Sequence, residues 1–236
     1  MTTATYHHGN LRAALVEAAV AVARESGPEG LAVRDLARRV GVSHNAAYRH
    51  FSDRDALVAE VAAVGLAELT SAMHRRIARV PPEDADDPTR PARSRLSECG
   101  RGYVDFALAE PGLFRVVFAA YPQAPSVEEL PARADADDPF TVLNALLDDL
   151  VAVGFLAPAA RAGAEITCWS AVHGFAVLHS EGPLRQLDGA ARTAMLDVVL
   201  DTIDRSYGAT TAGPASPAPS AEPRAPRPRP DGAGPG

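Results

Sequence analysis

Polar side chains gather around a short predicted helix in the segment from Leu31 to Phe51. Ser43 is a favoured helix N-cap, and His44, Asn45 and Ala46 follow it in the first turn. The next turn ends in an aromatic and basic run, Tyr48, Arg49 and His50. In the major groove asparagine pairs with adenine and arginine with guanine, whereas contacts to phosphates position the protein. The spacing therefore predicts a helix whose N-terminal end enters the major groove.

A second short helix is expected directly before this one, joined to it by a turn. Its apolar positions recur at helical spacing, and the arginines lie off that face: the apolar residues are Val33, Leu36, Ala37 and Val40. Gly41 is expected to end this helix in a left-handed conformation, and Val42 to be buried inside the turn. Ala47 and Phe51 are expected to face the domain core. The pattern favours a helix-turn-helix, and the alternative is an ordinary pair of amphipathic helices.

Two flanking helices complete the predicted N-terminal unit. The first starts near Leu11 behind Asn10 as a cap, and ends near Ser26 before Gly27, Pro28 and Gly30. The next runs from about 54 to 79 behind Ser52 and Asp53. The sequence thus predicts three helices and the start of a fourth.

At this point the chain resembles the tetracycline-repressor-like (TetR/AcrR) family of transcriptional regulators. The resemblance lies in YHHGNLRAALVEAA, GLAVRDLARRVGVSHNAAYRHF and SDRDALVAEV, within about the first 65 residues. It implies that base edges are contacted by Arg34, His44, Asn45, Ala46 and Arg49. It implies that phosphates are held by Tyr48, His50 and Arg54. Relatives often have Pro where Ala47 stands and Lys where Arg54 stands; neither change blocks binding, because Ala favours a helix and Arg is still a phosphate donor.

Composition sets the limits of the prediction. The 236 residues suffice for a DNA-binding domain at 1–57, a larger domain at 58–207 and a Pro-, Ala- and Gly-rich tail at 208–236 that is expected to be disordered. There is no run of 18 apolar residues and no signal peptide, so we expect no membrane association and a cytoplasmic protein.

Cys99 and Cys168 lack metal-type spacing; we expect two ordinary buried thiols, with a redox-sensing pair as the alternative.

The net charge of −7 is unusual for a nucleic-acid binder, but it is unevenly distributed. Up to residue 56 there are seven arginines and six carboxylates, besides four histidines. The acidic excess lies further on, in the segments 83–87 and 135–138, which we interpret as solvated loops. Specific binding must then depend on a few placed arginines, and it should weaken with salt.

The region from 58 to 207 is predicted to be helical throughout, which makes the fold all-α. The expected helices are 57–77, 96–108, 111–118, 139–153, 159–180 and 188–207. The sequences PGLFRVVF and Trp169, three residues, His173-Gly174 resemble a C-terminal effector domain of one branch of the same family. The resemblance implies a domain that binds a small ligand and forms dimers.

The candidate ligand-binding residues are mostly aromatic: Tyr103, Phe106, Phe114, Phe118, Trp169 and His173. Trp169 and His173 are four residues apart and share a helix face. The favoured interpretation is that Trp169 packs in the core and His173 bonds a neighbouring carbonyl, and direct ligand contact is the alternative. Gly174 is expected to let another helix approach closely.

Together these patterns and the resemblance predict a homodimeric transcription factor, and we favour a repressor over an activator. It would bind a palindromic site on double-stranded DNA and be released by an unidentified small molecule. The resemblance to relatives implies that its last two long helices form the dimer interface. A helical ligand carrier or interaction module without DNA binding is the alternative. The chain lacks GxSxG, HExxH and phosphate-loop motifs, so no enzyme activity, metal or cofactor is expected.

Overall fold

The computed structural model describes residues 11–84, 86–120 and 138–208. The helices in these ranges are α1 (Leu11–Ser26), η1 (Gly27–Gly30), α2 (Val33–Val40), α3 (His44–Tyr48), α4 (Arg54–Ile77), α5 (Arg90–Ala109), α6 (Pro111–Ala119), α7 (Pro139–Ala152), η4 (Pro158–Ala160), α8 (Ala164–Ser180) and α9 (Gly189–Gly208). No strand occurs in the described part of the chain, which confirms the all-α prediction. The predicted tail lies outside the described residues, apart from Gly208.

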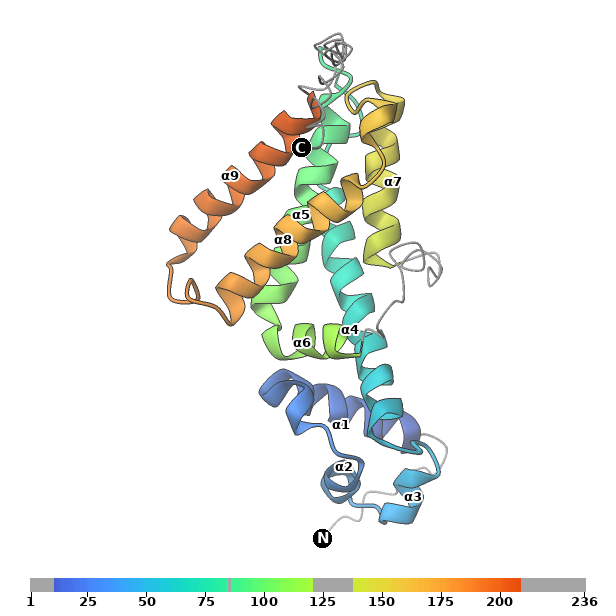
Figure 1. The fold of residues 1–236 in the computed structure, drawn as a ribbon. Helices are drawn as coiled ribbons and strands as arrows, with labels where there is room; N and C mark the ends of the chain where they lie inside the picture. Colours follow the sequence, from blue (N-terminus) through green and yellow to red (C-terminus); the bar gives the residue numbers. More distant parts are fainter. Residues whose placement is uncertain (1–10, 85, 121–137, 209–236) are drawn as a thin grey trace, which may run out of the picture.

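The N-terminal helices α1, α2 and α3 form a small unit at one end of the molecule (Figure 1). Gly41 ends α2 with φ of 78°, and the Ser43 hydroxyl accepts the Ala46 amide at 3.3 Å, as predicted for the turn and the cap. Ala47 and Phe51 are buried, as expected. Val42 packs against the core as expected for the turn, but it is half-buried and not completely covered.

Helix α4 connects this unit to the larger domain. Its start is capped by Asp53, whose carboxylate accepts the Ala56 amide at 2.8 Å. Among the described helices it alone is long and apolar enough to cross a membrane, but 44% of its most apolar segment is buried against other helices. It also carries Glu60 and Glu68, which pair with Arg12 and Arg24 of α1. We therefore describe α4 as a core helix shared by both domains.

The larger domain packs α5, α7 and α8 around the distal part of α4, with α9 along one side (Figure 1). The short helix α6 lies across the molecule between these helices and α1. Most buried residues form one continuous core that runs from α1 through α4 to α8 and α9. The two domains therefore share a hydrophobic core, and a displacement of α4 or α6 changes the packing in both domains.

Three sequence expectations for the larger domain need correction. The helix expected at 96–108 begins earlier, at Arg90, because Pro91 fits the first turn of a helix. The helix expected at 159–180 is interrupted: η4 ends at Ala160, and Gly163 takes a left-handed conformation with φ of 80° before α8 starts. Nothing in the described structure lies within 4 Å of a Cβ placed on Gly174, so no helix of the same chain packs there.

Candidate DNA-binding surface and effector cavity

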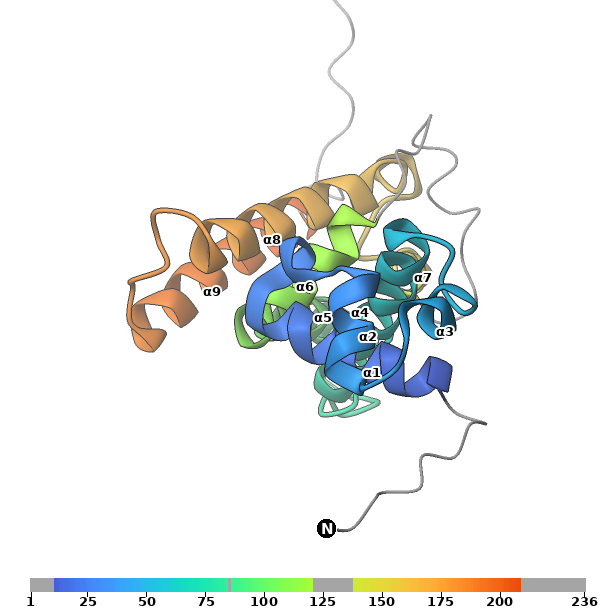
Figure 2. The same cartoon turned by 90° about the horizontal axis from the view of Figure 1, so that it is seen from below.

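The outward face of α2 and α3 is turned away from the rest of the molecule, as seen from below in Figure 2. Ser43, His44 and Asn45 are exposed at the start of α3, and Ala46 is half-exposed. Tyr48 is 49% exposed, although it is a large aromatic residue. The structure also leaves exposed the predicted DNA contacts Arg34, Arg49, His50 and Arg54. Each residue selected from the sequence as a DNA contact is therefore at least partly accessible to solvent.

The arginines of this surface differ in their partners. Arg38 pairs with Asp35 at 3.1 Å and Arg39 with Glu25 at 3.5 Å. Arg34 and Arg49, in contrast, form no ion pair with any described residue. Because a guanidinium without an acidic neighbour need not break a contact before binding, Arg34 and Arg49 are best suited to bind nucleic acid.

Arg54 has an internal role that the sequence did not reveal. Its Nε donates to the Leu31 carbonyl at 3.0 Å, and its Nη2 donates to the Pro28 carbonyl. The side chain thus ties the start of α4 to the segment between η1 and α2. It remains half exposed, so a phosphate contact would be additional to this structural role.

The larger domain contains a cavity between α4, α5, α7, α8 and α9. Its volume is about 80 Å³, which is room for several water molecules at ~10–15 Å³ each. The lining residues are Leu66, Leu69, Met73, Arg93, Leu96, Ser97, Cys99, Gly100, Tyr103, Phe118, Pro139, Phe140, Leu143, Cys168, Trp169, Val172, Leu200, Ile203 and Asp204. The cavity is thus largely apolar with a few polar groups, as ligand sites commonly are.

Three of the six predicted ligand-binding residues line this cavity: Tyr103, Phe118 and Trp169. The Trp169 Nε1 donates to the Tyr103 hydroxyl at 3.3 Å, and the same hydroxyl lies 2.8 Å from His173 Nδ1. His173 therefore bonds to a tyrosine rather than to the expected backbone carbonyl. Burial lowers the pKa of His173, which favours its neutral form.

The other three predicted ligand-binding residues, Phe106, Phe114 and His173, do not line the cavity. Phe114 packs against Phe118 with ring centroids 4.8 Å apart, and His173 contacts Phe118 at 4.5 Å. Both support the aromatic wall from behind. Phe106 is buried but borders a different groove, between α4 and α5, and the structure does not bring it to the cavity.

Sequence reasoning missed most of the apolar lining. The missed residues include Leu66, Leu69 and Met73 of α4, Phe140 and Leu143 of α7, and Leu200 and Ile203 of α9. Helical spacing assigns such residues to a core, and no sequence signal separates a cavity wall from a packed interior. Their importance here is that a cavity lined by α4 contacts the helix that leads to the DNA-binding domain.

The two cysteines also line the cavity. Both are buried, as predicted, and burial raises the pKa of Cys99 to about 12. Burial likewise raises the pKa of Cys168, whose Sγ lies 3.2 Å from the Tyr207 hydroxyl. A thiol with a raised pKa is a poor nucleophile at neutral pH, which favours the interpretation as ordinary buried thiols.

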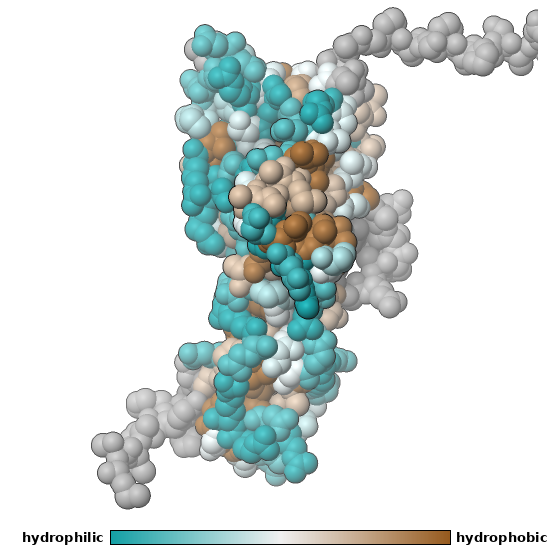
Figure 3. Space-filling model, turned by 90° about the vertical axis from the view of Figure 1, so that its left-hand side faces the viewer, coloured by the Kyte–Doolittle hydropathy of each residue, from teal (hydrophilic) through white to brown (hydrophobic). Residues whose placement is uncertain are grey.

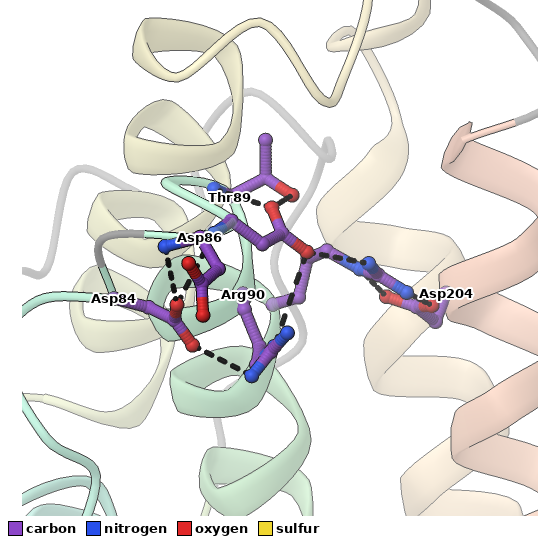
Figure 4. Close-up of polar contacts among 7 residues, drawn as sticks. Asp84, Asp86, Thr89, Arg90 and Asp204 are labelled. Atoms are coloured by element: carbon purple, nitrogen blue, oxygen red, sulfur yellow. Dashed lines mark hydrogen bonds and ion pairs between the residues drawn. The ribbon is translucent and has the colours of Figure 1, made fainter.

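The acidic segment 83–87 is more ordered in its described residues than a solvated loop would be (Figure 4). Asp84 accepts the amides of Asp86 and Asp87 and pairs with Arg90 at 2.7 Å. Asp87 accepts the Thr89 hydroxyl at 2.7 Å. These bonds join Asp84 and Asp87 to the start of α5, whereas Glu83 and Asp86 are exposed, as expected for a solvated loop. Residues 135–137 lie outside the described residues. No cluster of possible metal ligands occurs among the described residues.

An apolar area is exposed on α8 and α9. Its large side chains are Val177 and Leu178 of α8, 38% and 45% exposed, and Met195 and Val198 of α9, 40% and 64% exposed. Figure 3 views the molecule from this side and shows hydrophobic residues gathered on the larger domain. We refer to these four residues as the α8–α9 apolar face. Single exposed apolar residues are ordinary on a protein surface, whereas larger contiguous apolar patches are typical of surfaces that bind another molecule.

The fold and the exposed α2–α3 surface define a two-domain, all-α DNA-binding regulator. Comparison with protein families agrees: residues 15–61 match the family described as bacterial regulatory proteins, tetR family. Residues 96–203 match the tetracyclin repressor-like C-terminal domain. The chain belongs to the TetR family, whose members are transcriptional regulators and not enzymes.

Solved structures show the same fold. A protein with unknown function from Rhodococcus sp. RHA1 is 27% identical, with a TM-score of 0.69 over 87% of this chain and 100% of that one. A TetR variant from Acinetobacter baumannii AYE in complex with minocycline is 21% identical, with a TM-score of 0.55 over 84% and 97%. The regulator PfmR from Thermus thermophilus is 22% identical, with a TM-score of 0.52 over 85% and 97%. No match occurs among the curated proteins.

Proposed function

We propose that this TetR-family DNA-binding regulator is a cytoplasmic, homodimeric repressor that a small molecule releases from a palindromic operator. The observation that carries the proposal is the position of α4. Its N-terminal end packs on α1 of the DNA-binding domain, and three of its residues, Leu66, Leu69 and Met73, line the cavity. One rigid helix thus contacts both the ligand site and the DNA-binding domain.

The proposed DNA contacts divide into two groups. Arg34, His44, Asn45, Ala46 and Arg49 contact base edges, and Ser43, Tyr48, His50 and Arg54 position the helix and hold phosphates. This division is supported by the unpaired state of Arg34 and Arg49 among the described residues and by the exposure of the α3 face. Groove contacts then select the sequence while phosphate contacts supply affinity that depends on salt.

The dimer is proposed to form through the α8–α9 apolar face. Burying Val198 and Leu178 between two copies removes from water the two most exposed of the large apolar side chains on these helices. The open space beside Gly174, on α8, would then be filled by the partner copy instead of by this chain. A symmetric dimer places two α3 helices for two half-sites about one DNA turn, roughly 34 Å, apart.

A ligand releases the operator only if it binds more tightly to a state in which the two α3 helices have a different separation. The cavity touches α4 and also α6, through Phe118. Both helices pack on α1, so a ligand that changes the cavity width changes the orientation of the DNA-binding domain.

Selection of bound fragments from random or genomic DNA tests this function. We expect recovered sequences with two inverted half-sites, and the genes beside genomic fragments then give candidate effectors for release assays. Failure to enrich any sequence, together with retained ligand binding after deletion of residues 1–56, would favour the alternative of a helical ligand carrier.

A further inference from the structure

The charges at the cavity are few and are already paired with one another. Among the described residues that line the cavity, only Arg93 of α5 and Asp204 of α9 carry charge at neutral pH. The Arg93 Nε donates to one Asp204 oxygen at 3.0 Å, and its Nη2 donates to the other at 2.6 Å. This is the two-bond geometry that makes arginine–carboxylate pairs strong. A ligand carboxylate would have to displace Asp204 before it bound Arg93.

Further contacts surround the Arg93 guanidinium. The Asp87 carboxylate lies 3.8 Å from its Nη1, and the Phe155 ring lies beneath it with the guanidinium carbon 4.6 Å from the centroid. Figure 4 shows the polar contacts in this region, with Asp204 on α9. The neighbouring acidic residues Asp84 and Asp86 are balanced only in part by Arg90. Around Arg93 the described carboxylates therefore outnumber the guanidinium groups, which disfavours an anionic ligand.

Apart from Asp204, which is already paired with Arg93, no described lining residue carries a negative charge that could pair with a cation. Its polar groups are the hydroxyls of Ser97 and Tyr103, the Trp169 indole nitrogen and the Cys99 and Cys168 thiols. His173, bonded to Tyr103 behind the wall, is held in its neutral form because burial lowers its pKa. A cation buried here would lose its hydration without gaining a carboxylate, and an unpaired buried charge is costly.

We propose that the cavity binds an uncharged, mainly apolar ring compound that carries one hydroxyl or carbonyl group. The ring packs against Phe118, Phe140 and Trp169. The Ser97 hydroxyl, which lines the cavity, can both donate and accept, so either kind of oxygen on the ligand is satisfied. The inference rests on the proposed ligand-responsive function and specifies its ligand class.

Three probes that share one tolyl ring test the charge preference: 4-methylbenzyl alcohol, 4-methylbenzoate and 4-methylbenzylammonium. Binding to the full-length protein without DNA is measured by calorimetry and by the emission of Trp169, the single tryptophan of the chain. We expect the alcohol to bind at least about 10-fold more tightly than either ion, since a 1.4 kcal/mol difference in binding suffices for that ratio. Equal or tighter binding of either ion would overturn the proposal.

A variant pair ties the preference to the ion pair. Asp204→Asn removes the carboxylate that occupies Arg93, so binding of 4-methylbenzoate should strengthen and the alcohol-to-benzoate affinity ratio should fall at least several-fold. Asp201→Asn, an exposed position on the same helix, removes the same charge away from Arg93 and should leave both affinities unchanged. If Asp204→Asn does not alter the alcohol-to-benzoate ratio, Arg93 and Asp204 do not set ligand charge and the proposal fails.

The outcome is separable from that of the proposed function because DNA is absent from these titrations. Tight binding of the alcohol with no effect on operator affinity would support the ligand class and count against ligand-controlled release. Tightest binding of an ion, together with release of the operator by that ion, would overturn the ligand class and leave the regulatory function standing.

Discussion

Gly112 at the start of α6 lies directly against Ala23 in the last turn of α1. A Cβ added to Gly112 would stand 2.2 Å from the Ala23 carbonyl oxygen and 2.7 Å from that of Arg24. Both neighbours are backbone atoms, which cannot move aside as a flexible side chain can. The junction between the DNA-binding domain and the larger domain is therefore a close backbone contact that only glycine permits.

Gly112→Ala should separate α6 from α1 and lower the free energy of unfolding by about 1–3 kcal/mol, the usual cost of overpacking. For a chain of this size that corresponds to a fall in the thermal midpoint of several °C, measured by circular dichroism. Gly189→Ala is the matched control, because its added Cβ meets no described atom within 4 Å. An unchanged midpoint for Gly112→Ala would show that the junction is loose.

Arg49→Ala should weaken binding to the selected operator by about 1–3 kcal/mol and relax base preference at the position it contacts. Tyr48→Phe should instead weaken binding to all sequences about equally, because a hydroxyl that donates to phosphate carries no base information. Fluorescence anisotropy on the operator and on single-base variants distinguishes the two patterns. Arg79→Ala controls for loss of one exposed positive charge after α4. Unchanged base selectivity in Arg49→Ala would contradict its assignment to a base edge.

Val198→Asp should convert the dimer to monomer, since it places a carboxylate in the centre of the α8–α9 apolar face, where the native side chain is 64% exposed. Sedimentation velocity reports the mass, and operator affinity should fall with it because a palindrome needs two α3 helices. Val153→Asp, an equally drastic change at a 38% exposed position after α7, should leave the mass unaltered. A monomeric wild-type protein would rule out this interface.

Acid should destabilise the protein partly through His173. Burial lowers the pKa of His173 in the folded state, so the unfolded chain takes up its proton at higher pH than the folded one. The stability that neutral His173 contributes is thus present above an unfolded pKa of about 6.5 and is lost as pH falls below it.

His173→Asn retains a polar partner for Tyr103 and should reduce the loss of stability between about pH 7 and pH 5, the range in which an unperturbed histidine titrates. Urea unfolding at both pH values measures the difference. The same pH dependence in both proteins would show that other groups cause the acid sensitivity.

The turn and the helix cap of the N-terminal unit could be predicted from residues close to them in the sequence. The αL conformation of Gly41, the cap at Ser43 and the burial of Ala47 and Phe51 are set by residues within a turn or two of each other, so the sequence predicts them. The break before α8 was missed because Gly163 and Pro158 lie within an otherwise continuous apolar pattern.

By itself the sequence determined an all-α chain with a helix-turn-helix, and it determined which polar residues of α3 stand at the protein surface, because helical periodicity and capping act over a few residues. Only the tertiary structure decided that Arg93 pairs with Asp204, 111 residues away. It also decided that Phe118 lines the cavity while Phe106 does not, and that Arg54 donates to the carbonyls of Pro28 and Leu31. Such contacts depend on how whole helices cross, and the spacing of residues along one helix carries no information about its neighbour's register.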